Sequence, residues 1–163
     1  MSSKPTEDEL WRFQEQWAPT VMLFCRLCTG DAQAANDATT HAFEEYFSAG
    51  KPLHLDHVPT SLMSLAFEEC QSSAGGIGTD VQSEFESAVL SLEPDERAIF
   101  ILHGVLDLWL PWVAAITRIP FETVNPLWTR ALINLRLSTV RDDYSQFFAD
   151  CAMLFQSQSE AFA

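Results

Sequence analysis

Residues 88–136 contain the helix-start and turn signals of a helix-turn-helix, in which two short helices cross at a tight turn. Pro94 stands at an expected helix start, because the first-turn N–H of a helix has no internal partner. Pro111 marks a second start in the same way, and a brief turn follows at residues 118–120. Thr123 is expected to cap the next helix, since its hydroxyl can accept an unpaired backbone N–H. The stretch therefore predicts crossed helices.

The apolar spacing is helical in the rest of the chain as well, and no segment has the pattern of a strand. A capping box at Thr6–Glu9 predicts a helix start, and Pro19 is expected to kink or split that helix. Gly30-Asp31 is expected to end it and to begin the next helix, over residues 32–47. A third helix is expected to start at residue 60 or 61. The predicted fold class is all-α.

The segment Gln71–Thr79 (QSSAGGIGT) is the clearest linker, since Gly and Ser give a flexible backbone. The expected organisation is a helical bundle at 1–71, a linker at 72–79, a helix-turn-helix bundle at 80–141 and an amphipathic C-terminal helix at 142–163. The apolar face expected for that last helix consists of Tyr144, Phe147, Phe148, Cys151, Leu154 and Phe155. Such a face predicts either packing on its own domain or an interface with a partner or a second copy.

The charge of the chain limits its partners. Nine basic against 23 acidic residues give a net charge of −14, which repels nucleic acid and anionic membranes and favours basic protein surfaces. No stretch approaches the roughly 18 uncharged apolar residues of a membrane span. The N-terminus, MSSKPTEDEL, lacks the apolar core of a secretion signal. We therefore expect a cytoplasmic protein with reduced thiols.

An ordered set of short matches runs along two thirds of the chain. In the second half they are Leu92-x-Pro94, Arg97, Leu102, Val113-Ala114, Ile119-Pro120, Thr123-Val124, Arg130-Ala131 and Leu135-Arg136. In the first half they are Gly30-Asp31, Ala35, Asp37 and Phe43. Together they resemble regions four and two of RNA polymerase sigma factors of the extracytoplasmic-function type. The resemblance implies a promoter-binding second half and a first half that grips the polymerase clamp. The implied polymerase-like surface is Asp37, Thr40, His41 and Phe43, with Thr40 and His41 in place of the family's Gln and Glu.

The helix-turn-helix departs from the family where it would meet DNA. Asn125, Pro126 and Leu127 stand where the family tends to carry Lys-Ser-Arg. Pro126 lacks an N–H and is tolerated only in the first turn of a helix, so the helix is expected to begin near Thr123 or to be kinked. Glu122 replaces a usual glycine.

Positive charge is scarce over the same region. Specific DNA-binding proteins neutralise on the order of 6–10 phosphates with Lys and Arg. The residues that remain as candidate DNA contacts are Arg118, Asn125, Arg130 and Arg136. The stretch 62–70, which corresponds to the basic promoter-melting part of region two, has two glutamates and no Lys or Arg. Direct reading of DNA is therefore expected to be weakened or lost.

Three hypotheses for function follow. The first is a sigma-like regulator that works through contacts with an anti-sigma factor or core RNA polymerase. Its altered helix-turn-helix face would comprise Trp109, Trp112, Asn125, Leu127 and Trp128. The second is an active extracytoplasmic-function sigma factor with divergent promoter recognition. The third is a structural helical dimer, for which the aromatic tail would suffice.

No metal, cofactor or catalytic site is expected. Cys25 and Cys28 have the spacing of half a zinc site, but a structural zinc site usually takes four ligands, and on an amphipathic helix free Cys often behaves as a small buried hydrophobe. His54 and His57 lie in a predicted loop without a partner motif. The glycines of residues 75–78 follow no strand and open no dinucleotide fold. An enzyme has no positive support in the sequence.

Overall fold

The computed structural model describes residues 3–55, 57–72 and 84–138. All regular secondary structure in these ranges is helical, which confirms the all-α prediction. From residue 73 on, the predicted linker lies outside the described residues, as does the helix predicted over 142–163. Within the described ranges, no helix is long and apolar enough to cross a lipid bilayer.

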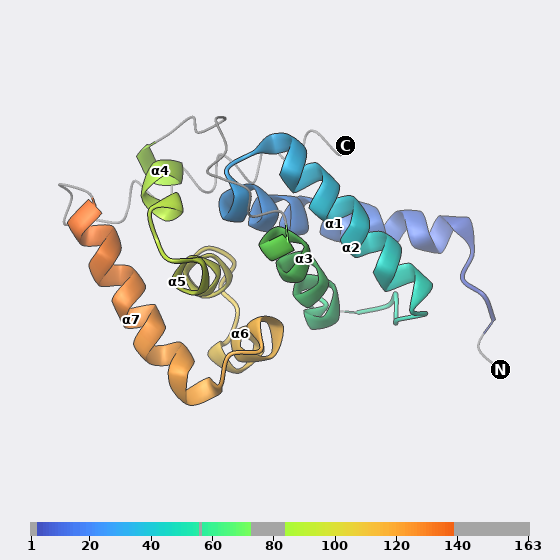
Figure 1. The fold of residues 1–163 in the computed structure, drawn as a ribbon. Coiled ribbons are helices and arrows are strands. Elements are labelled where there is room, and N and C mark those ends of the chain that lie inside the picture. Colours follow the sequence, from blue (N-terminus) through green and yellow to red (C-terminus); the bar gives the residue numbers. More distant parts are fainter. Residues whose placement is uncertain (1–2, 56, 73–83, 139–163) are drawn as a thin grey trace.

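Three helices form the first half: α1 (Glu7–Thr29), α2 (Ala32–Ser48) and α3 (Thr60–Ser72). They pack together on one side of the molecule (Figure 1). Aromatic side chains fill the space between α1 and α2, where the Phe13 ring stacks on Tyr46 at a centroid distance of 5.0 Å. This packing gives α1 and α2 a shared apolar core along much of their length.

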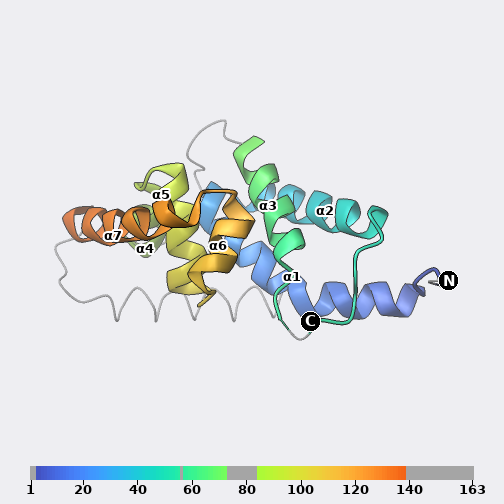
Figure 2. The ribbon, with the colours of Figure 1, turned by 90° about the horizontal axis from the view of Figure 1, so that it is seen from below.

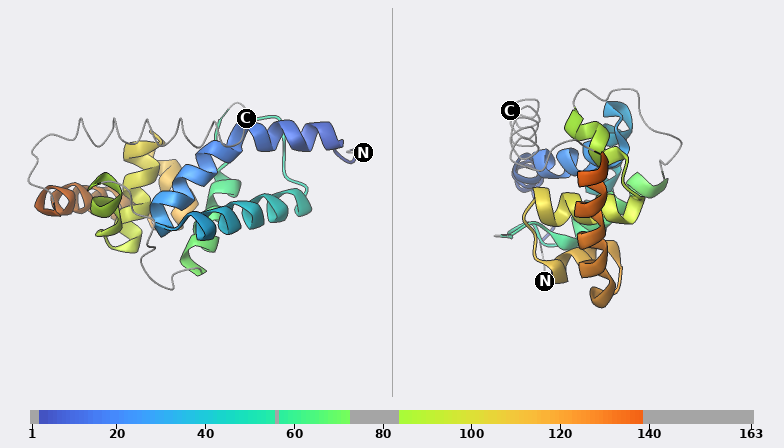
Figure 3. Two further views of the ribbon diagram at one scale, coloured as in Figure 1. Left: turned by 90° about the horizontal axis from the view of Figure 1, so that it is seen from above. Right: turned by 90° about the vertical axis from the view of Figure 1, so that its left-hand side faces the viewer.

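The predicted capping box begins α1. The Thr6 N–H donates to the Glu9 carboxylate at 2.8 Å, and the Glu9 N–H donates to the Thr6 hydroxyl at 3.2 Å. Gly30 ends α1 in the left-handed region, with φ of 67°. The Asp31 side chain then caps α2, as expected. Pro19 lies inside α1 without splitting it, and α1 bends along its length (Figure 3), which fits the clash of a proline ring with the preceding turn.

The second half consists of α4 (Glu84–Leu90), α5 (Pro94–Ile99), the π-helical segment η1 (Phe100–Val105), α6 (Leu110–Thr117) and α7 (Phe121–Ser138). Helices α6 and α7 are the two arms of the predicted helix-turn-helix. The prolines at residues 94 and 111 lie in the first turn of α5 and α6, as the sequence predicts.

The start of α7 differs from the prediction. The helix begins at Phe121, so Thr123 is not its cap, and the Thr123 N–H donates to the Pro120 carbonyl at 2.8 Å. Pro126 consequently lies inside α7, where it removes the hydrogen bond that residue 126 would donate to the Glu122 carbonyl. The cap prediction was wrong because Pro120 is the residue before the helix, and its carbonyl accepts the first backbone hydrogen bonds of α7, from Thr123 and Val124.

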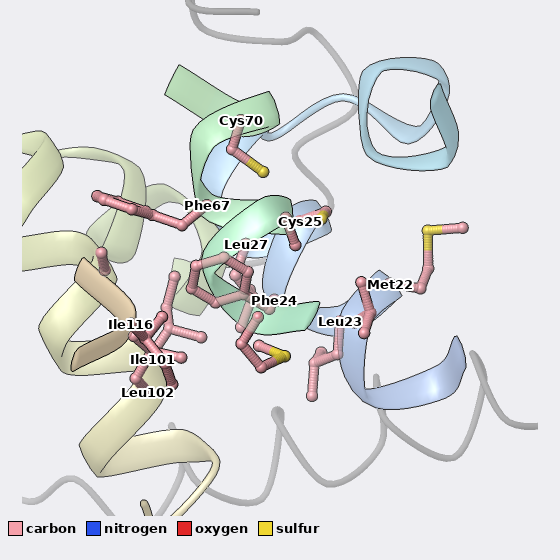
Figure 4. Packing of buried hydrophobic residues seen from close by; sticks show 14 of the residues in the cluster. Met22, Leu23, Phe24, Cys25, Leu27, Phe67, Cys70, Ile101, Leu102 and Ile116 are labelled. Carbon is pink, nitrogen blue, oxygen red and sulfur yellow. The ribbon is translucent and has the colours of Figure 1, made fainter. Parts of the chain in front are cut away.

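The two halves share one hydrophobic core. Phe24 of α1 and Phe67 of α3 lie next to Ile101 and Leu102 of η1 and Ile116 of α6 (Figure 4). Helix α3 thus packs directly on α6, the first arm of the helix-turn-helix. The π-helical turn aids this packing, since its wider coil, closed by the Leu106 N–H on the Ile101 carbonyl at 2.9 Å, turns three consecutive apolar residues into the interior.

Candidate protein-interaction surface

The outer face of α7 is open to solvent and nearly without positive charge. The exposed residues from its start to Ile133 are Phe121, Glu122, Thr123, Asn125, Pro126, Thr129, Arg130 and Ile133. Arg130 is the single cation of this described set, and the negative charge of Glu122 offsets its positive charge. This is the face that a recognition helix would turn toward DNA.

Both arginines of the helix-turn-helix with a described side chain are engaged by carboxylates. At the turn, the Arg118 guanidinium lies 2.7 Å from a carboxylate oxygen of Glu68 in α3. On α7, Arg130 lies 3.4 Å from Glu96, a residue of α5 that is only 1% exposed. Asn134 also donates to Glu96, at 2.8 Å. These partners reduce the positive potential that the arginines would offer to a phosphate.

Exposed aromatic and aliphatic side chains are concentrated on the helix-turn-helix. Trp109 is 73% exposed, Phe121 54% and Ile133 53%. Trp112 is 36% exposed, and its ring centroid lies 5.1 Å from that of His57 in the loop before α3. Of the five large apolar side chains exposed in the described part of the chain, these four belong to α6, α7 and the residue before α6.

Two residues predicted for the altered face lie inward instead. Leu127 and Trp128 are only partly exposed and pack against the core. The Trp128 ring stacks on Phe100 at 6.0 Å and meets the His103 ring edge at 4.7 Å. Gly104 makes this approach possible, since a Cβ there would lie 2.9 Å from the Trp128 ring. Trp109, Trp112 and Asn125 therefore remain as the accessible part of the predicted face.

The predicted polymerase-like surface on α2 is accessible in three of its four residues. Asp37, Thr40 and His41 are exposed. Asp37 accepts a hydrogen bond from the Gln33 amide at 2.9 Å. Phe43, in contrast, is 2% exposed and belongs to the aromatic core between α1 and α2, so its side chain cannot meet a partner directly.

Arg97 joins several helices, although the sequence identified it only as one of the residues that match the sigma-factor pattern. One of its terminal nitrogens donates to the Cys28 carbonyl at the end of α1, at 2.8 Å. The other donates to the carbonyls of Leu90 and Leu92, at 2.8 and 2.9 Å. Partial burial lowers the pKa of Arg97, but the group stays charged because an unperturbed guanidinium titrates far above neutrality. Arg97 thereby ties α1, α4 and α5 together.

A buried ion pair joins the halves nearby. Arg26 of α1 lies 3.6 Å from Glu86 of α4, and both side chains are almost fully buried. The sequence did not indicate this pair, because Arg26 and Glu86 are far apart in the chain and meet only when α4 packs on α1. Buried pairs of this kind are destabilising when one partner is removed, so they favour a fixed arrangement of the two halves.

The cysteines belong to the packing of the first half. Cys25 is fully buried, and its hydrogen bond to Cys70, followed by burial, raises its pKa well above the ordinary value of 9.0. Cys25 and Cys70 lie on facing helices (Figure 4). In the part of the chain that is described, no three His, Cys, Asp or Glu side chains converge as metal ligands would.

Comparison with known proteins identifies the fold. No family model and no curated protein sequence matches the chain. Among solved structures, the chain is similar to the sigma factor RpoE from Bartonella quintana, which was crystallised in complex with the anti-sigma factor NepR. The two are 17% identical in sequence with a TM-score of 0.67, over 81% of this chain and 99% of RpoE. This chain therefore has a sigma-factor-like all-α fold.

Proposed function

We propose that this protein is a cytoplasmic sigma-like regulator of transcription that acts through protein–protein contacts and has weakened or lost DNA binding. The partner class that we favour is an anti-sigma factor, with core RNA polymerase as the second. In this proposal the exposed residues of the helix-turn-helix meet polypeptide, and Asp37, Thr40 and His41 form the polymerase-like surface.

One observation carries the proposal, namely the composition of the outer face of α7. Its exposed residues up to Ile133 include one arginine, already paired with a buried carboxylate, and Arg118 at the turn is paired as well. Binding to a DNA duplex depends on several free cations, since each neutralised phosphate adds affinity by releasing counterions. A chain with a net charge of −14 adds a general repulsion.

The exposed residues of the whole helix-turn-helix, including those at the start of α6, have the composition of a protein interface. Trp109 and Phe121 are both exposed aromatic residues of the kind enriched at interfaces, and Trp is among the residue types that most often carry the binding energy. Phe121 is the first residue of α7 and Trp109 directly precedes α6, so the backbone at both positions is already ordered and little of its freedom is lost on binding. The related fold in RpoE was crystallised with an anti-sigma factor, which supports this class of partner for the present chain.

The test begins with affinity purification of the tagged full-length protein from its native cells. We expect an anti-sigma factor among the retained proteins, and the purified pair should bind by calorimetry. Trp109→Ala and Phe121→Ala should each weaken that binding by tenfold or more, because loss of an interface anchor costs about 2 kcal/mol. Gln16→Ala, a change at an exposed residue of α1, serves as the control and should leave binding unchanged.

Three results would contradict the proposal or the argument behind it. Promoter-dependent transcription by core polymerase with this protein added would identify an active sigma factor. A stable symmetric dimer without either partner would favour a structural role. Salt-sensitive binding of the free protein to duplex DNA would separately overturn the argument from charge.

A further inference from the structure

Trp11 is the one large exposed apolar side chain in the described first half, and it is 64% exposed. It lies in the N-terminal half of α1, at the end of the molecule farthest from α7 (Figures 2 and 3). Phe13, two residues further along, anchors this part of α1 against Phe43, Tyr46 and Phe47 of α2. Trp11 is therefore fixed on a rigid element, on the side of α1 that α2 leaves uncovered.

Three carboxylates surround Trp11 on this face. Glu7 and Asp8 precede it by four and three residues, and Glu15 follows it by four, so all three are its neighbours on the helix surface. Together the four residues occupy about 100° of arc on α1. All are exposed, and none of the three carboxylates makes an ion pair or side-chain hydrogen bond with another described residue. Arg12, four residues after Asp8 and three before Glu15, borders this stripe on one side and offsets one of its three negative charges.

Helix stability accounts for only part of the stripe. Glu7 and Asp8 lie in the first turn, where negative charge interacts favourably with the helix dipole. Glu15 lies two turns further on, beyond the reach of that effect, and an exposed Trp adds nothing to it. The combination of an aromatic anchor and flanking carboxylates is instead that of a surface complementary to a cation.

We propose that the stripe Glu7, Asp8, Trp11 and Glu15 is a docking surface for an Arg- or Lys-rich polypeptide segment. A guanidinium or ammonium group would lie over the Trp11 ring, where the negative face of the ring attracts it. Neighbouring basic residues of the segment would pair with the three carboxylates. Arginine suits this surface best, because it can stack on the indole and donate two hydrogen bonds to one carboxylate.

The chain itself offers few cations for this role. The arginines already held by other described groups are Arg26, Arg97, Arg118 and Arg130. A second copy of the chain carries the same net charge of −14 and is repelled on average. Nucleic acid and anionic lipid are repelled for the same reason. Charge complementarity therefore selects a basic protein segment as the occupant.

The test uses the full-length protein and a fluorescein-labelled nonaarginine peptide, with binding followed by fluorescence anisotropy at physiological salt. Trp11→Ala, which leaves the net charge unchanged, should weaken binding by about tenfold. Trp11→Phe should retain most of the affinity, because it keeps an aromatic face. In ¹⁵N spectra, the indole N–H signal that disappears in Trp11→Phe should shift when the peptide is added to the wild-type protein.

A charge-matched control separates this surface from general attraction to an acidic protein. The triple variant Glu7→Gln/Asp8→Asn/Glu15→Gln should weaken binding by tenfold or more. The control triple variant Glu44→Gln/Glu45→Gln/Asp95→Asn removes the same charge from exposed positions elsewhere and should weaken it less than threefold. Equal loss in both triple variants, an unaffected Trp11→Ala, or no binding by the wild-type protein would overturn the proposal. Circular dichroism checks that every variant keeps its helical content.

Discussion

Replacing Arg97 by alanine is expected to lower the free energy of unfolding by about 2–4 kcal/mol. The guanidinium donates three hydrogen bonds of 2.8–2.9 Å to the carbonyls of Cys28, Leu90 and Leu92. A hydrogen bond from a charged group contributes about 1.5–3 kcal/mol, but the three are not additive, because water can reach some of the carbonyls once the side chain is gone. The expected loss is a large part of a typical stability of about 5–15 kcal/mol.

Urea unfolding followed by circular dichroism measures this loss. With a slope of about 2 kcal/mol per molar urea, a loss of about 2–4 kcal/mol should lower the midpoint by roughly 1–2 M. Arg97→Lys should recover part of the loss, since an ammonium group on a flexible stem can reach one or two of the carbonyls but not all three. Arg12→Ala, which removes an exposed arginine without a described partner, should change stability by less than about 0.5 kcal/mol. A loss in Arg97→Ala as small as that of the control would refute the reasoning.

Three further changes test local features. Gly30→Ala should cost about 1–3 kcal/mol in thermal unfolding, because φ is +67° and the new Cβ would lie 2.6 Å from a leucine methyl of α4. Asp107→Gly should raise stability by about 0.5–1 kcal/mol, since this exposed residue has φ of 56°. The hydrogen bond from the Thr6 N–H, and then that from His54, lower the pKa of Glu9 below its ordinary 4.5. The stability that the capping box contributes is therefore present above about pH 4.5 and is lost as the pH falls through the pKa of Glu9 in the folded protein. A carboxyl ¹³C titration should show that lowered pKa, and His54→Ala should raise it.

Local signals in the sequence were reliable where a single residue type determines the backbone. The capping box, Gly30-Asp31 and the prolines at 94 and 111 predicted helix boundaries because each acts through its own backbone or that of near neighbours. Thr123 failed as a cap because the competing boundary signal, Pro120, lies three residues earlier. Propensity alone does not rank two adjacent signals of this kind.

Tertiary features were harder to predict. The π-helical turn at η1 has no local signature in FILHGV, since it follows from packing against α1, α6 and α7. Burial of Phe43 was likewise missed, because a resemblance to a family motif indicates a position on a helix but not which way the side chain points. The carboxylates that engage Arg118 and Arg130 come from α3 and α5, distant in sequence, so their pairing required the fold.

The packing of α3 on α6 limits how the sequence of such a chain can evolve. Phe67 of α3 and Ile116 of α6 belong to the same buried interior, so exchanging one segment alone would disturb the packing of the other. A chimera that imported residues 84–138 from a distant relative would bring an ill-fitting surface against α3, with voids or overlaps that each cost about 1–3 kcal/mol. The two halves are therefore expected to evolve together, because this avoids the loss of stability. New binding preferences are more readily acquired by substitutions at solvent-exposed positions.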